Sequence, residues 1–105
     1  MYITITEQYT SVTGAPLAGW VRFTPVPALR LPGTGITEGY TRVTLDSAGA
    51  FQVPLLATTD PAVRPAGAIY RVCEMIGMSR REYAVTVPHD AGNPLALSAL
   101  PRVEG

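Results

Sequence analysis

Short segments of alternating apolar and polar residues recur along this chain, and glycine, proline or aspartate separates each segment from the next. Alternation with a period of two places apolar side chains on one face of a strand, whereas Gly, Pro and Asp favour the backbone conformations of tight turns. At this spacing the chain is expected to be all-β, with a single antiparallel β-sandwich of about seven short strands spanning residues 1–105. The expected strands are residues 3–6, 20–24, 41–45, 50–54, 68–76, 81–87 and 95–100, the last being a short strand or a turn.

The alternation also predicts which side chains face the core. Val21 and Phe23 share the inward face of the strand at 20–24. The segment 68–76 is apolar on both faces, which is typical of a strand at the centre of a sheet. Residues 25–35 hold three prolines, and proline lacks the backbone donor that a central strand needs. This stretch is therefore predicted to be an irregular connection.

The clearest hairpin is expected to join the strands at 41–45 and 50–54. The connection at 46–49 starts with Asp and ends with Gly, which suits a type I turn followed by a left-handed residue. Asp46 and Asp60 are accordingly interpreted as residues whose side chains bond their own backbone. The side chains expected to face inward from this pair are Val43, Leu45, Phe51 and Val53.

Composition excludes several classes of function. Eight basic residues, all of them arginine, balance eight acidic ones without any basic run, so no nucleic-acid partner is expected. No segment has the length of a membrane span, and residues 1–6 lack the features of a secretion signal, which predicts folding in the cytoplasm and no membrane partner. Cys73 is the single cysteine, so an intrachain disulfide is excluded, and its apolar neighbours predict a buried, inert thiol.

Catalytic constellations are missing from the sequence. His89 and Asp90 are the one pair suggestive of acid–base chemistry, but adjacent residues of an extended chain point to opposite faces. No serine has the context of a nucleophile, and a single His and a single Cys on distant segments do not make a metal site. We therefore expect no enzyme activity, no cofactor and no bound metal.

The aromatic residues Trp20 and Tyr40 leave two hypotheses open. Exposed aromatic rings on one face would serve as stacking platforms for a sugar, which predicts a glycan-binding module. The favoured alternative is that Trp20 packs at an edge of the sandwich or under the proline-rich connection.

The order of these motifs resembles a known group of domains. Residues 14–19 followed by 20–25 resemble the opening of prealbumin-like domains, which include carboxypeptidase-regulatory-like and Cna-B-like sandwiches, and residues 45–51 are similar to their central hairpin. The longer resemblance is to small β-sandwich domains in minor tail and tail-fibre proteins of phages that infect actinobacteria. Those domains have a G-x-V-x-F-T-P-like strand, an L-D-x-x-G-x-F hairpin and an A-T-x-D-P loop in this order, and here the loop is 57–61.

The resemblance implies a prealbumin-like or Ig-like fold and a structural protein of the virion, assembled in the host cytoplasm. Its partners would be other virion subunits, in a homo-oligomer or another multi-copy assembly. A tail-associated role, as a minor tail or fibre-attachment subunit, is the leading hypothesis. A capsid decoration protein is the alternative within the virion, and the glycan-binding module is the alternative outside it.

Candidate contact residues for such partners come from three places. A terminal strand at 1–6 can add to or swap into a neighbouring sheet. Prolines in 25–35 reduce the conformational entropy that a loop loses on binding. The adjacent arginines expected in the turn before the strand at 81–87 would form a charged rim. The predicted contact residues are Tyr2, Ile3, Ile5, Pro25, Pro27, Leu29, Leu31, Arg80 and Arg81.

Overall fold

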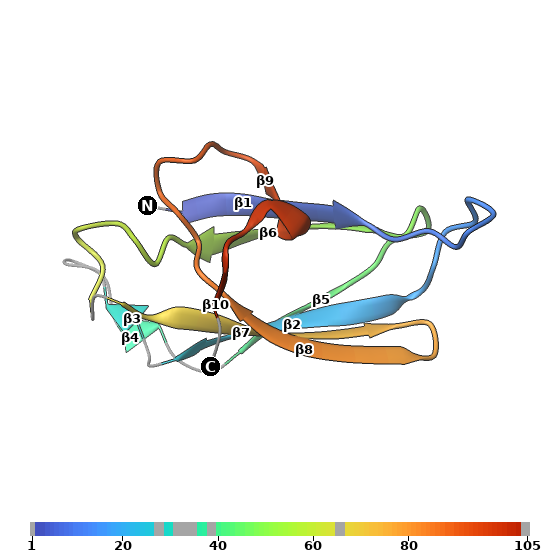
Figure 1. Cartoon of the computed structure of the whole chain (residues 1–105), viewed down its shortest axis with the longest axis horizontal. Coiled ribbons are helices and arrows are strands. Elements are labelled where there is room, and N and C mark those ends of the chain that lie inside the picture. Colours follow the sequence, from blue (N-terminus) through green and yellow to red (C-terminus); the bar gives the residue numbers. More distant parts are fainter. Residues whose placement is uncertain (1, 27–28, 31–35, 38–39, 65–66, 104–105) are drawn as a thin grey trace.

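Two β-sheets packed face to face form the protein, as the sequence predicted (Figure 1). The structure is a computed structural model and describes residues 2–26, 29–30, 36–37, 40–64 and 67–103. The smaller sheet has the order β6-β1-β9, and the larger has the order β10-β8-β7-β2-β5. The all-β sandwich is therefore confirmed.

The smaller sheet contains β1 (Tyr2–Gln8), β6 (Ala50–Leu56) and β9 (Leu95–Ala96). The larger sheet contains β2 (Gly19–Val26), β5 (Thr41–Thr44), β7 (Ile69–Ile76), β8 (Ser79–Val85) and β10 (Arg102–Val103). A separate two-stranded ladder pairs β3 (Leu29–Arg30) with β4 (Ile36–Thr37), and a 3₁₀ turn covers Leu97–Ala99. The pairs are antiparallel apart from β1 with β9, which run parallel.

The predicted hairpin between 41–45 and 50–54 is wrong. β5 pairs with β2 in the larger sheet, whereas β6 pairs with β1 in the smaller one. The connection itself has the predicted chemistry, because Asp46 Oδ1 accepts hydrogen bonds from the backbone N–H groups of Ala48 and Ala50, and Gly49 has a φ of +76°. This turn consequently carries the chain from one sheet to the other, and local turn residues do not specify which strands pair afterwards.

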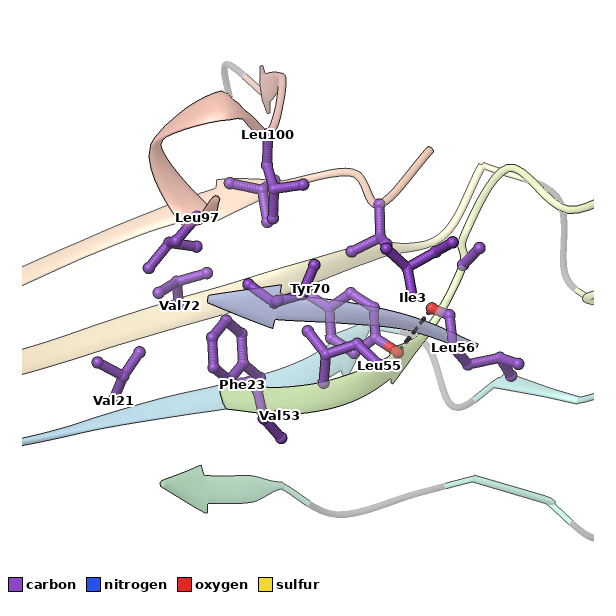
Figure 2. Close-up of a cluster of buried hydrophobic side chains, with 14 of the residues drawn as sticks. Ile3, Val21, Phe23, Val53, Leu55, Leu56, Tyr70, Val72, Leu97 and Leu100 are labelled. Atoms are coloured by element: carbon purple, nitrogen blue, oxygen red, sulfur yellow. Dashed lines mark hydrogen bonds between the residues drawn. The ribbon is translucent and has the colours of Figure 1, made fainter. Parts of the chain in front are cut away.

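The core lies between the two sheets (Figure 2). Ile3 and Ile5 of β1 face Val21 and Phe23 of β2 across this space, and all four side chains are fully buried. The Tyr70 hydroxyl donates a hydrogen bond of 2.9 Å to the Leu56 carbonyl, which links β7 of one sheet to the end of β6 in the other. The inward positions expected for Val21, Phe23, Leu45, Phe51 and Val53 are confirmed, and Val43 is half-buried against the same core.

The proline-rich stretch 25–35 is more regular than expected. β2 continues through Pro25 to Val26, and the ladder of β3 with β4 begins within the stretch. Within the described ranges, the pairing of β5 with β2 covers Trp20 to Phe23 and stops short of Pro25, and such a position tolerates a residue that lacks a backbone donor. The irregular connection predicted for all of 25–35 is therefore corrected for the residues that the structure describes.

The expectations for β7, Cys73 and residues 95–100 hold. β7 lies at the centre of the larger sheet, and Cys73 on it is buried. Residues 95–100 combine the two alternatives left open for them, because a two-residue strand leads directly into the 3₁₀ turn. Within the described ranges, no helix has the length and apolar character required to cross a membrane.

Candidate functional site

The outer face of the larger sheet gathers arginines from four different strands. Alternate residues of a strand point to the same face, and the buried positions of β2 identify Val21 and Phe23 as the inner set. Pairing then places Arg42 beside Arg22, and Arg22 beside Cys73, on the outer face. We define the arginine face as Arg22 of β2, Arg42 of β5, Arg71 of β7 and Arg80 of β8.

The sequence did not reveal this cluster. Its arginines are far apart along the chain, so no basic run exists, yet neighbouring strands lie about 4.8 Å apart and bring their side chains together. Among the described residues of the face, four arginines stand against one carboxylate, that of Glu82, which pairs with Arg80 at 3.0 Å. The face therefore carries a local positive surplus in a protein of zero net charge. The absence of a basic run in the sequence therefore does not exclude a positively charged surface in the fold.

Trp20 belongs to the same outer face. The Arg22 guanidinium lies 5.9 Å from the centre of the Trp20 ring and 5.5 Å from that of Tyr40, and the Arg42 guanidinium lies 5.5 Å from the Trp20 ring. These distances are in the range of cation–π contacts. Trp20 is half-buried on β2, which has β7 on one side and β5 on the other, so its expected place at the edge of the sandwich is corrected. The alternative place under the proline-rich connection stays a prediction, because most of that connection lies outside the described residues.

A hollow of about 520 Å³ opens on this face. Small side chains on three neighbouring strands, Thr24, Cys73 and Ala84, alternate there with longer ones. In one row Arg71 lies between Thr24 and Ala84, and in the next row Cys73 lies between Arg22 and Glu82. The longer side chains of Arg22, Arg71 and Glu82 surround them. Cys73 is only 4 % exposed in this setting.

A second polar cluster lies on the inner face of the larger sheet, at the end away from the fully apolar core. Glu74 is only 3 % exposed. The Tyr9 hydroxyl donates a 2.5 Å hydrogen bond to its carboxylate, and Arg81 donates through Nε at 3.1 Å and Nη2 at 2.8 Å. Burial by itself would raise the pKa of Glu74, but hydrogen bonds from Tyr9, Tyr83 and Arg81 outweigh it and hold the pKa below its ordinary value of 4.5.

The cluster continues to the edge of the sheet through Tyr83. The guanidinium of Arg102 lies 3.8 Å from the centre of the Tyr83 ring, and that of Arg81 lies 5.4 Å from it. Burial and the neighbouring Glu74 carboxylate raise the pKa values of Tyr9 and Tyr83, which keeps both hydroxyls protonated as donors. The fully partnered carboxylate indicates a structural role for Glu74, that of anchoring the connection after β1 to the larger sheet.

Replacing Glu74 tests that role. The change Glu74→Gln removes the charge that Tyr9 and Arg81 bind, and hydrogen bonds to a buried charged group are worth about 2 kcal/mol. We expect a loss of about that size in the free energy of unfolding at neutral pH, measured by urea denaturation. The matched control is Glu82→Gln, which removes an exposed, ion-paired carboxylate on the next strand and should leave the unfolding midpoint unchanged.

The same pair of proteins predicts a pH dependence. The folded pKa of Glu74 is lowered, so its stabilising contribution is complete above its unfolded value of 4.5 and is lost as the pH falls through the folded value. The stability difference between the wild type and Glu74→Gln should therefore close under strongly acidic conditions. A difference that stays constant with pH would show that the charge of Glu74 is not what stabilises the fold.

The predicted contact residues of the terminal strand lie in two environments. Tyr2 is 52 % exposed at the start of β1, whereas Ile3 and Ile5 are fully buried in the core. β1 also has β6 on one side and β9 on the other, so it is not a free edge. The expectation that Ile3 and Ile5 offer their side chains to a partner is thus corrected, because in this fold they hold the two sheets together.

The remaining predicted contacts do not form one surface. Pro25 is half-buried within β2, Leu29 belongs to the backbone ladder of β3, and Pro27 and Leu31 lie outside the described residues. Arg80 and Arg81 are consecutive residues of β8, not of the turn before it. Arg80 consequently belongs to the outer arginine face, whereas Arg81 reaches Glu74 on the inner face.

The residues considered above as candidates for acid–base chemistry or metal binding form hydrogen bonds within loops and turns. The backbone N–H of His89 donates to Thr59 Oγ1, and His89 Nδ1 lies 2.7 Å from the same oxygen, so Thr59 orients the ring. Asp46 and Asp60 accept hydrogen bonds from nearby backbone N–H groups, as predicted for turn residues. Over the described ranges, no group of three or more His, Cys, Asp or Glu side chains is arranged to hold a metal ion.

Comparison with known proteins adds no family assignment. No family model matches this sequence, and no curated protein is significantly similar to it. The features that bear on function are therefore the order of the sequence motifs and the surfaces that the fold creates, chiefly the arginine face.

Proposed function

We propose that this protein is a non-enzymatic assembly module of a phage virion, most readily a tail-associated minor tail or fibre-attachment subunit with a prealbumin-like sandwich. The order of its motifs supports a virion protein. The observation that carries a binding role is the arginine face, an open and charged surface spread over four strands of one sheet. Such a surface suits contact with other virion subunits, which are the proposed partners in a multi-copy assembly.

The edges of the sandwich favour docking through a face over strand addition. The Thr4 N–H donates to Asn93 Oδ1 and so points away from β6. Pro54, which is paired with Thr4, therefore has its backbone nitrogen on the outer edge of β6, where proline offers no N–H to an added strand. Among the described residues, β10 pairs with Ala84 and Val85, and the part of β8 before them carries the charged residues Arg80, Arg81 and Glu82. Proline and charges are common guards against edge pairing, and here they stand in for the absent lysines.

The glycan-binding alternative has weaker support. A pyranose needs an uncovered aromatic face, but guanidinium groups of Arg22 and Arg42 lie over the Trp20 ring. Tyr40 is 63 % exposed, yet it also contacts Arg22. A partner bound through charged contacts needs only the guanidinium groups of Arg22 and Arg42, so the stacking of these groups on the aromatic rings does not oppose it.

Purified particles of the phage that carries this gene would test the proposal. Quantified mass spectrometry should detect the protein in the particle, at a few to dozens of copies for a tail subunit. Hundreds of copies would identify a capsid decoration protein in its place. Absence from purified particles would refute a virion role altogether.

A further inference from the structure

We propose that the arginine face binds a polypeptide segment of mixed acidic and apolar character, with its carboxylates at Arg22 and Arg71. This inference rests on the proposed assembly function and specifies the chemistry of the partner. Both arginines line the hollow, and they lie diagonally across the paired strands β2 and β7.

The state of these arginines supports a carboxylate ligand. In the described part of the chain, Arg22, Arg42 and Arg71 form no salt bridge, whereas Arg80 already has Glu82. A guanidinium presents a planar fork of donors that matches a carboxylate with two parallel hydrogen bonds. The stacking of Arg22 on Trp20 and Tyr40 also restricts its side chain before a ligand arrives, which reduces the entropy lost on binding.

The lining of the hollow distinguishes a polypeptide from other anions. Ile69, Ala84 and Val103 contribute apolar surface next to the arginines. A peptide with alternating acidic and apolar side chains offers groups for both, whereas a phosphodiester backbone or a sulfated sugar offers charge but little apolar surface. The protein also has zero net charge, so it has no overall field to attract a dense polyanion from a distance.

The probe for this test is a short fluorescein-labelled peptide of alternating glutamate and leucine, titrated with the whole chain and followed by fluorescence anisotropy. We expect binding that weakens as salt is added, because the contacts are partly exposed charge pairs. The double variant Arg22→Gln/Arg71→Gln should weaken it about tenfold. A peptide of alternating lysine and leucine should not bind.

The matched control is Arg64→Gln/Arg102→Gln, which removes two positive charges from exposed positions outside the arginine face. Both double variants should melt as cooperatively as the wild type, and only the first should lose affinity. Equal losses in the two variants, no binding of the acidic peptide, or tighter binding of a DNA duplex or heparin would each overturn the inference.

The outcome is separable from that of the proposed function. Incorporation into particles without peptide binding would overturn this inference and leave the virion role standing. Peptide binding by a protein that is absent from particles would support the chemistry of the face and refute the virion role.

Discussion

The substitution Gly49→Ala is expected to lower the free energy of unfolding by about 4 kcal/mol. Gly49 has a φ of +76°, where a residue with a Cβ is strained by about 1–2 kcal/mol. A Cβ there would also lie 2.3 Å from the Tyr9 carbonyl oxygen and 3.1 Å from the Leu17 nitrogen. Both atoms are backbone, so neither can move aside without displacing the connection between β1 and β2, and overpacking of this kind costs about 1–3 kcal/mol more.

The chain provides a matched control in Gly14. Its φ of +85° imposes a similar backbone strain, but no atom lies within 4 Å of the position that a Cβ would take. Gly14→Ala should therefore cost only about 1 kcal/mol. Urea denaturation of both variants measures the two losses in the free energy of unfolding. Their difference is the cost of the close contact between the turn at residues 46–49 and the connection from β1 to β2. Equal losses would mean that the turn does not dock there.

The substitution Phe23→Ala is expected to cost about 4 kcal/mol, as for other large-to-small changes in cores. Phe23 is fully buried on β2, and its ring centre lies 6.0 Å from that of Phe51 on β6 of the other sheet. Removal of the ring leaves a cavity between two sheets whose strands are held in place by their backbone ladders, so little collapse can fill it. The unfolding midpoint in urea should fall with an unchanged dependence on denaturant.

Two further variants bracket this prediction. Phe23→Leu retains most of the apolar volume and should cost no more than about 1.5 kcal/mol. Tyr40→Ala removes an aromatic ring from the surface and should change stability by less than about 0.5 kcal/mol. A loss for Phe23→Ala as small as that for Tyr40→Ala would contradict the packing of the two sheets through this residue.

The sequence predicts correctly those features that depend only on residues a few positions apart, such as the face to which a side chain points and the hydrogen bonds within a turn. Val21 and Phe23 face the core and Asp46 bonds the following backbone, because each depends on residues a few positions away. Prediction failed for the supposed hairpin, since the residues of its turn are equally compatible with a return in the same sheet and a crossing to the other. Ile3 and Ile5 were misplaced for a related reason, because a terminal strand can lie at an edge or between two partners.

The candidate site was the hardest feature to predict. Alternation suggests outward positions for Arg22 and Arg42, whereas Arg71 lies in a segment that reads as apolar on both faces. The meeting of the three depends on the order in which β5, β2 and β7 pair. The buried cluster is similar, because the Tyr9 hydroxyl reaches Glu74 across 65 residues of sequence. A charged residue inside a predicted apolar strand was the one available signal of that partnership.

The sequence by itself therefore determined the all-β character, most of the strands and the side chains that each strand buries, because alternation and turn chemistry are local properties of the backbone. The tertiary structure alone decided which strands pair, where the chain crosses between the sheets, and that scattered arginines form one surface. Those features arise from contacts between distant residues, and many pairings of the same strands satisfy the same local pattern.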